Sequence, residues 1–334
     1  MKGKGKPMEQ KTRDNAYLPE GSLIDTDTNV MYLSSLRMLE KAMYKGKILE
    51  GICTVCDCRD MSLRVDLGIC EGIIPREEAQ YSPEGAKDIA VITRVGKPVA
   101  FKVMKITGGD RPRVLLSRKA AQEECRREYV SNLRVGDIVP ATVTHLDSFG
   151  AFVDIGCGII SLICVDSISV SRIFHPRDRL YAGQKIHAVV KAVDASGGRM
   201  YMSLRELLGT WEENAEAFTA GSCVAGIVRS VEEYGIFVEL TPNLAGLAEL
   251  RDGISPGDTC SVYIKSIIPE RMKIKLVIVD SLKTPSQSTL KYYVDTDTVR
   301  HISYWRYSPE GCRKVIETAF DPCTSIKRGM SLAK

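Results

Sequence analysis

The chain repeats one pattern of short strands three times. A glycine-led β pattern begins at Gly46, Gly136 and Gly221, and superimposing these glycines aligns the segments that follow them. In the second and third copies the same spacing separates the glycine from an aromatic residue, Phe149 or Tyr234. Such a repeat restricts the fold to a series of similar small modules, because internal repetition is typical of chains assembled from equivalent structural units.

Each copy contains enough strand patterns for a small barrel. A second glycine-led strand is expected at residues 95–106, 182–193 and 256–267, and a closing strand at residues 113–119, 199–205 and 271–277. Five short strands separated by glycine-containing turns favour a closed barrel of the OB type. The predicted fold class is therefore all-β: three tandem five-stranded OB-fold barrels joined by short helices, with a disordered N-terminal arm and a small C-terminal tail module.

The expected domain boundaries follow from these patterns. They are a disordered arm with a leading helix (1–45), a degenerate first barrel (46–119), a helical linker (120–135), a second barrel (136–206), another helical linker (207–220), a third barrel (221–282) and the tail (283–334). The arm, rich in Gly, Lys, Pro, Asp and Thr, is expected to reach about Asn29. The tail is expected to form a hairpin and a helix, with Trp305 buried against the third barrel.

Composition limits the class of protein. With 44% hydrophobic residues the chain is globular, and with 46 basic and 42 acidic residues any nucleic-acid footprint must be local. Eleven scattered cysteines, an odd number, favour reduced thiols over a disulfide framework and so a cytoplasmic location. The basic N-terminus lacks the apolar run of a secretory signal. No window approaches the roughly 18 apolar residues of a membrane span.

Two phenylalanines occupy unusual positions in the second copy. In the strand after the turn, Ala151, Val153 and Ile155 share one face and are expected to point into the core. Phe152 shares the opposite, outward face, and Phe149 lies at the turn just before it. Outward rings can stack on nucleobases, at roughly 1–3 kcal/mol for each stacked base.

These segments resemble a known family. Residues 149–154 (FGAFVD), 161–164 and 199–205 of the second copy, with 234–240 (YGIFVEL) and 243–250 (NLAGLAEL) of the third, are similar to the S-one type RNA-binding domain of the bacterial small-subunit ribosomal protein S-one family. The first copy retains RVDLG at 64–68 and VLLSRK at 114–119. The resemblance covers most of the chain, and it implies OB-fold barrels that bind single-stranded RNA.

The resemblance also implies binding residues in the second copy. The two aromatics are Phe149 and Phe152, Asp194 occupies a further family binding position, and Arg199 is the basic residue of the last strand. Cys164 stands where the family has a histidine, which is expected to weaken the site without abolishing it. By alternation, Arg199, Tyr201, Ser203 and Arg205 are expected to form one outward row on the closing strand.

The third copy keeps the aromatics and the first copy loses them. In the third copy Tyr234 and Phe237 are the aromatics, Glu249 occupies the histidine position, and Arg271, Lys273 and Lys275 are expected to form a basic stripe that neutralises phosphates. The first copy has Met61 and Arg64 at the aromatic positions and Pro75 at the histidine position. Its barrel is expected to fold and to serve as a docking or structural module.

Other candidate sites are weaker. Cys53, Cys56 and Cys58 have a spacing found at metal sites, but a tetrahedral zinc site needs four ligands, and only Cys70 is a nearby candidate for the fourth. Buried strand cysteines are the favoured interpretation. No cofactor or metal is therefore expected. His145 and His187 are expected to be exposed strand or loop residues.

The sequence predicts a non-enzymatic protein of translation that binds single-stranded mRNA through the second and third barrels, in association with the small ribosomal subunit. No phosphate-binding loop, carboxylate pair or nucleophile triad is evident, and the three barrels leave no room for a catalytic domain. The alternative is a regulatory RNA-binding factor of RNA turnover or transcription that is not stably bound to the ribosome. The oligomeric state and the RNA sequence preference stay open, since base stacking tolerates any sequence.

Overall fold

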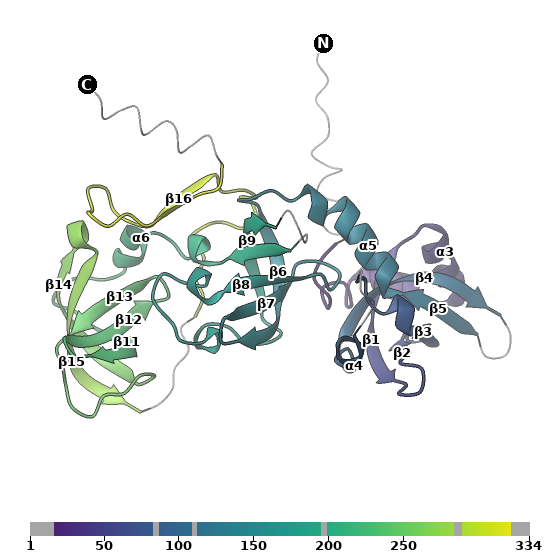
Figure 1. Cartoon of the computed structure of the whole chain (residues 1–334), viewed down its shortest axis with the longest axis horizontal. Coiled ribbons are helices and arrows are strands. Elements are labelled where there is room, and N and C mark those ends of the chain that lie inside the picture. Colours follow the sequence, from purple (N-terminus) through teal and green to yellow (C-terminus); the bar gives the residue numbers. More distant parts are fainter. Residues whose placement is uncertain (1–16, 83–86, 109–111, 195–198, 284–288, 322–334) are drawn as a thin grey trace, which may run out of the picture. The chain divides into compact units, whose positions relative to one another are not determined.

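The computed structural model describes residues 17–82, 87–108, 112–194, 199–283 and 289–321, and it contains three closed five-stranded barrels (Figure 1). Barrel 1 comprises β1 (Ile48–Cys56), β2 (Leu63–Asp66), β3 (Glu71–Ile74), β4 (Pro98–Thr107) and β5 (Arg113–Ser117). Barrel 2 comprises β6 (Ile138–Asp147), β7 (Gly150–Asp154), β8 (Ile160–Cys164), β9 (Lys185–Val193) and β10 (Met200–Ser203). Barrel 3 comprises β11 (Cys223–Glu232), β12 (Gly235–Thr241), β13 (Leu244–Ala248), β14 (Thr259–Ile268) and β15 (Lys273–Leu282).

The three barrels share one topology. Their strands follow the same cyclic order, and in each barrel the third strand pairs in parallel with the fifth: β3 with β5, β8 with β10, and β13 with β15. The fold class predicted from the repeat, three tandem barrels of the OB type, is confirmed.

The inward-facing residues predicted from strand alternation are buried in all three barrels. They are Leu63, Val65 and Leu67 in barrel 1, Ala151, Val153 and Ile155 in barrel 2, and Ile236 and Val238 in barrel 3. Leu240, also expected to point inward in barrel 3, is partly buried against the same core. Each buried aliphatic side chain of this size contributes about 1.5–3 kcal/mol relative to an exposed one. The period-two pattern thus accounts for the cores.

Short helices connect and flank the barrels. They are α2 (Asp27–Leu33), α3 (Leu36–Tyr44), α4 (Asp88–Ile92), α5 (Arg118–Glu128) and α6 (Trp211–Ala215). The hydroxyl groups of Ser35 and Ser117 cap α3 and α5 by accepting hydrogen bonds from backbone N–H groups of the first turn. The leading helix expected before the first strand is present as α3. No helix in the described part of the chain is long and apolar enough to cross a bilayer.

The expected disorder is wrong for residues 17–29. Residues 1–16 lie outside the described residues, but residues 17–29 have a defined structure. The Asn29 side chain is buried, and it bonds both to the N–H of Glu50 at 2.9 Å and to its carbonyl at 3.0 Å. The expectation failed because the polar composition of this segment is used for contacts with β1, which local composition cannot reveal.

The C-terminal segment packs as a hairpin. β16 (Tyr304–Arg306) pairs antiparallel with β17 (Glu317–Ala319), and Trp305 belongs to the apolar core cluster of barrel 3. The predicted burial of Trp305 is confirmed. The predicted helix is wrong for the described residues 289–321, because residues 317–319 extend and pair with β16 instead. Residues 322–334 lie outside the described part.

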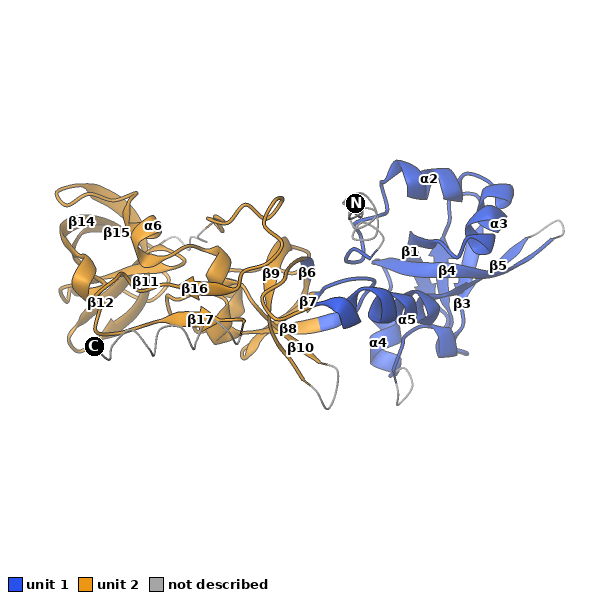
Figure 2. Cartoon of the chain, turned by 90° about the horizontal axis from the view of Figure 1, so that it is seen from above, with its two compact units in different colours: residues 1–133, 140–142, 154–160 blue, residues 134–139, 143–153, 161–334 orange. Residues whose placement is uncertain are grey.

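The chain divides into two compact units (Figure 2). Unit 1 comprises residues 1–133, 140–142 and 154–160, and unit 2 comprises residues 134–139, 143–153 and 161–334. The boundary passes through barrel 2. The turn after β7 therefore belongs to unit 1, and all of barrel 3 belongs to unit 2.

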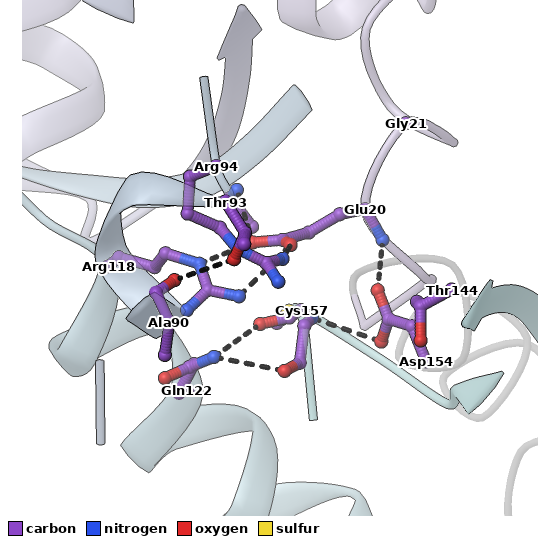
Figure 3. A network of polar contacts seen from close by, with 12 residues as sticks. Glu20, Gly21, Ala90, Thr93, Arg94, Arg118, Gln122, Thr144, Asp154 and Cys157 are labelled. Carbon is purple, nitrogen blue, oxygen red and sulfur yellow. Dashed lines mark hydrogen bonds and ion pairs between the residues drawn. The ribbon is translucent and has the colours of Figure 1, made fainter. Parts of the chain in front are cut away.

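A buried ionic network holds the N-terminal segment within unit 1 (Figure 3). The Glu20 carboxylate accepts hydrogen bonds from Arg118 Nε at 2.6 Å and Nη2 at 3.0 Å, and Arg94 Nη1 lies 3.4 Å away. The Glu20 N–H donates to Asp154 Oδ2 at 2.7 Å. Burial, together with the nearby Glu20 carboxylate, raises the pKa of Asp154 to about 7.

Candidate nucleic-acid interface

Barrel 3 aligns an aromatic, an aliphatic and a basic side chain across three strands. Phe237 of β12 lies opposite Leu247 of β13, and Leu247 lies opposite Lys275 of β15. The ring of Tyr234, in the turn before β12, meets the Phe237 ring edge-on at 6.0 Å and 87°. Tyr234 is 69% exposed, so the ring pair is open to solvent beside a cation.

Barrel 2 has the same arrangement with a different residue at the end. Phe152 lies on β7, beside β8, where Leu162 lies opposite Tyr201 of β10. The rings of Phe149 and Phe152 meet edge-on at 5.7 Å and 89°, and Phe149 is 51% exposed. We call Phe149, Phe152 and Tyr201 the barrel 2 platform. The barrel 3 platform consists of Tyr234, Phe237 and Lys275.

His145 lies against the barrel 2 platform, a contact that the sequence analysis did not predict. It is exposed, as expected, but its ring stacks against Phe152 at 6.1 Å with an interplanar angle of 27°. In barrel 3 the register puts Ser230 opposite Phe237 at the equivalent position. Position in the hairpin could have revealed the contact, because His145 and Phe152 are equidistant from its turn, and such residues face each other across antiparallel strands.

The basic residues of barrel 3 divide into two groups. Lys273 and Lys275 are exposed on β15, while the intervening Ile274 is buried, as the alternation predicted. Arg271 is exposed but lies before the strand, in a 3-10 turn that ends at Met272, whose φ is 50°. The stripe therefore starts in a turn and continues along β15.

The remaining predicted residues of barrel 2 lie around the β10 end. Arg199 is exposed, and its carbonyl accepts a hydrogen bond from the Asp194 N–H at 2.8 Å, which closes the β9–β10 hairpin. Cys164 is half-buried at the end of β8. Its neighbour Val165 donates to the Phe149 carbonyl at 3.0 Å, so Cys164 lies close to the platform.

The expected outward row on β10 ends at Tyr201. Ser203 is fully buried and hydrogen-bonds Glu206. The Arg205 guanidinium donates to Glu206 at 3.2 Å and to Thr318 at 3.2 Å. The expectation failed here because the chain leaves the strand after Ser203, in a 3-10 turn over Arg205–Leu207 that the C-terminal segment contacts.

Two carboxylates on the same strand face as the platform phenylalanines are buried. Asp154 and Glu239, which occupy equivalent positions two residues after Phe152 and Phe237, are each 2% exposed. Asp154 accepts hydrogen bonds from backbone N–H groups, including those of Gly156 and Gly158. Glu239 instead forms ion pairs with the guanidinium groups of Arg179 and Arg229. Neighbouring segments cover both positions, which strand alternation alone cannot reveal.

Barrel 1 presents different chemistry on the equivalent strands. Arg64 of β2 lies opposite Ile73 of β3, which lies opposite Leu115 of β5. Arg64 is paired with Glu71 at 2.8 Å. Met61, at the other aromatic position of the sequence alignment, lies just before β2 with a φ of 57°. The matching row of barrel 1 is therefore an ion pair and two aliphatic residues, with no ring.

The cysteine cluster differs in exposure from member to member. Cys53 is buried, Cys56 is half-buried and Cys58 is exposed. Burial raises the pKa of the Cys53 thiol to about 11. In the part of the chain that the structure describes, no group of three or more His, Cys, Asp or Glu side chains is arranged to hold a metal ion.

Comparison with known proteins identifies relatives. The family model of the S1 RNA binding domain, the S-one type, matches residues 132–205. Small ribosomal subunit protein bS1 of Leuconostoc lactis is 36% identical over 196 residues, which cover 54% of this chain and 45% of the relative. The bS1 homolog of Bacillus cereus is 36% identical over 219 residues, covering 64% and 54%. The bS1 protein of Staphylococcus aureus is 25% identical over 310 residues, covering 86% and 75%.

The family match agrees with the position of one barrel. The chain spans about half the length of the Leuconostoc and Bacillus relatives that it matches. The family match coincides with barrel 2. Residues 132–205 therefore match the S1 RNA binding domain, and the chain is similar to small ribosomal subunit protein bS1 over more than half of its length.

Proposed function

We propose that the chain is a non-enzymatic protein of translation that binds single-stranded RNA through the platforms of barrels 2 and 3. The observation that carries the proposal is the repeated row: an exposed ring pair on the second strand, continued across the third and fifth strands, in two separate barrels. Rings in such positions fill no core, and stacking on bases is their most favourable use. The relatives named as ribosomal proteins agree with a binding role and not a catalytic one.

The ligand is argued from the chemistry of the two platforms. Stacked bases must be unpaired, so a single strand fits the exposed rings better than a duplex. Lys273 and Lys275 lie on β15, which β13 separates from the strand of Phe237, and there they can neutralise phosphates as the bases stack. Within translation, mRNA and the small ribosomal subunit are the partners that we propose for these surfaces. Barrel 1, without rings, is proposed as a docking or structural module.

The test is RNA binding by the full chain with both central rings removed. The variant Phe152→Ala/Phe237→Ala is expected to bind a single-stranded oligoribonucleotide at least about thirtyfold more weakly, because two stacking contacts of roughly 1–3 kcal/mol each are lost. Arg64→Ala, the barrel 1 residue at the equivalent row position, is the matched control and is expected to change little. Fluorescence anisotropy measures both. Unchanged affinity in the double variant would exclude the platforms as the binding surface.

Cosedimentation separates the two cellular roles. A protein of translation is expected to sediment with small ribosomal subunits at moderate salt, whereas a regulatory RNA-binding factor would remain in the free fraction while still binding RNA. The Phe152→Ala/Phe237→Ala variant adds a control, since cosedimentation that survives the double substitution would depend on a surface other than the platforms.

A further inference from the structure

The long β8–β9 connection of barrel 2, residues 165–184, presents an aromatic ring and two arginines to solvent. Phe174 is 62% exposed, and the Arg172 guanidinium lies 5.7 Å from the centre of its ring. Arg172 and Arg177 are also exposed. From Val170 to Arg177 the sequence contains no acidic residue. Barrel 3 has a much shorter connection at this position, residues 249–258, and it contains no aromatic residue.

Buried residues hold this loop in place. Ile173, at 6% exposed, and Leu180, at 1%, anchor it on either side of Phe174. Between them, His175 caps a 3-10 turn. Its ring Nδ1 accepts a hydrogen bond from the backbone N–H of Arg177 at 3.1 Å, and the backbone N–H of His175 donates to the Asp178 carboxylate at 3.4 Å. The exposed ring therefore projects from a fixed backbone, which lowers the conformational entropy lost when a ligand binds.

The two ends of the loop contact the strands that carry the two platforms. At its start, Val165 donates to the carbonyl of Phe149 at 3.0 Å, within the barrel 2 platform. Towards its end, Arg179 forms a buried ion pair with Glu239, two residues from Phe237 on β12 of barrel 3. All of these residues belong to unit 2. The exposed Arg172, Phe174 and Arg177 thus lie on a segment that connects one platform to the other.

We propose that Arg172, Phe174 and Arg177 form a bridging RNA contact that holds the same single strand between the barrel 2 and barrel 3 platforms. This inference rests on the proposed RNA binding and deepens it by naming a third binding surface. The Phe174 ring stacks on a base, and the two guanidinium groups contact flanking phosphates, the combination that binds single strands without sequence preference. A single strand is favoured over a protein partner because the two arginines flank the exposed ring of Phe174, the loop's other exposed ring is Tyr181, and no exposed aliphatic residue of the loop extends the surface.

The experiment compares a short and a long oligouridylate on the full chain. OB-fold barrels occupy about 4–16 nucleotides each, so an oligomer of about 8 nucleotides fits one platform and one of about 24 reaches both. Phe174→Ala is expected to weaken binding of the long oligomer about tenfold and of the short one less than twofold. Tyr44→Ala, which removes an aromatic that is 92% exposed on α3, is the matched control and is expected to change neither.

Two further measurements make the proposal specific. Arg172→Gln is expected to reduce the slope of log K against log salt by about 0.7 for the long oligomer only, as for one lost phosphate contact on a single strand. Ultraviolet crosslinking of a long 5-iodouridine oligomer is expected to label the peptide that contains Phe174.

The outcomes distinguish failure of this inference from failure of the proposed function. If Phe174→Ala leaves the long oligomer unaffected, or weakens both oligomers equally, there is no bridge, although the platforms can still bind RNA. If Phe152→Ala/Phe237→Ala also has no effect, the proposed function fails as well. Loss of a copurifying protein on Phe174→Ala, without any change in RNA affinity, would assign the loop to a protein partner and overturn the inference.

Discussion

Barrels 2 and 3 have the same topology, and each carries a row of outward side chains with a phenylalanine on the second strand and a leucine on the third. The rows differ in the residues that the first and fifth strands contribute. In barrel 2 the row ends in Tyr201 and is extended by His145, so it is almost entirely aromatic. In barrel 3 the same positions are Lys275 and Ser230, so one ring pair lies beside a cation. Barrel 2 is therefore suited to stacking, and barrel 3 to a mixture of stacking and charge neutralisation.

The barrels also differ in the groups that pair with the buried carboxylate of the second strand. At equivalent positions, Asp154 receives backbone N–H groups in unit 1, whereas Glu239 receives two guanidinium groups in unit 2. Side chains that point into the barrel core are similar in the two barrels, whereas those on the outward strand face have different partners in each. Four predictions test this comparison.

The largest effect is expected at the buried carboxylates. Glu239→Gln should lower the free energy of unfolding of unit 2 by about 3–5 kcal/mol, because it leaves two guanidinium groups without their buried counter-charge. Asp154→Asn should cost unit 1 only about 1–2 kcal/mol, since an amide oxygen can still accept a backbone N–H. Urea denaturation followed by hydrogen exchange resolves the two units. Equal costs would show that the two positions hold their neighbours in the same way.

The next effect concerns the glycines that open the two barrels. Gly136 has a φ of 97°, and a Cβ there would lie 2.4 Å from the carbonyl oxygen of Ile302 in the C-terminal segment. Gly221 has a φ of 92° and nothing within 4 Å of the same position. Both alanine substitutions carry the backbone strain of about 1 kcal/mol or more, but Gly136→Ala should cost about 2 kcal/mol beyond it.

Limited proteolysis provides the second readout for the glycine pair. Gly136→Ala is expected to expose the C-terminal segment to cleavage, because that segment is held by two backbone hydrogen bonds next to the substitution. The Ile138 N–H donates to the Arg300 carbonyl, and the Ile302 N–H donates to the Gly136 carbonyl. Gly221→Ala should leave cleavage of the segment as in the wild type. Identical proteolysis of the two variants would mean that the segment does not depend on its contact with barrel 2.

The pH dependence of unit 1 gives a smaller effect. Burial raises the pKa of Asp154 and of Glu50 to about 7, above the values near 4 of carboxyls in unfolded chains. The folded state then binds more protons between about pH 4 and 7, so stability should fall as pH rises through that window and level off above it. Asp154→Asn combined with Glu50→Gln should flatten this fall, which is expected to exceed about 1 kcal/mol. Thermal melts from pH 5 to 8 provide the measurement, and a wild-type stability that rises over this range would contradict the prediction.

The smallest effect separates charge from stacking. Lys275→Gln should reduce the slope of log K against log salt by about 0.7, with only a few-fold loss of affinity at moderate salt, because one phosphate contact is removed. Tyr201→Ala, at the equivalent position of barrel 2, should weaken binding without changing the slope. RNA titrations at several salt concentrations measure both quantities. A slope that changes in both variants, or in neither, would remove the distinction between the two platforms.

Much of the fold and part of the site could be predicted from particular residues. The repeat of glycine-led strands gave three barrels, and alternation placed Val153 and Ile236 inside and Lys273 outside, because a strand exposes every second side chain whatever surrounds it. The stacking of His145 was not predicted, because it depends on Phe152, the residue across the hairpin. The partial burial of Arg205 depends on a segment more than a hundred residues later in the chain.

The sequence by itself determined the number of barrels, their cores and the aromatic positions, because all of these follow from local periodicity and from comparing one copy with another. Only the tertiary structure decided which outward residues stay open. Glu239 and Ser203 share a strand face with open residues, but segments distant in sequence cover them, and Asp154 is enclosed by the N-terminal segment. Burial of an outward position depends on long-range packing, and strand periodicity carries no information about it.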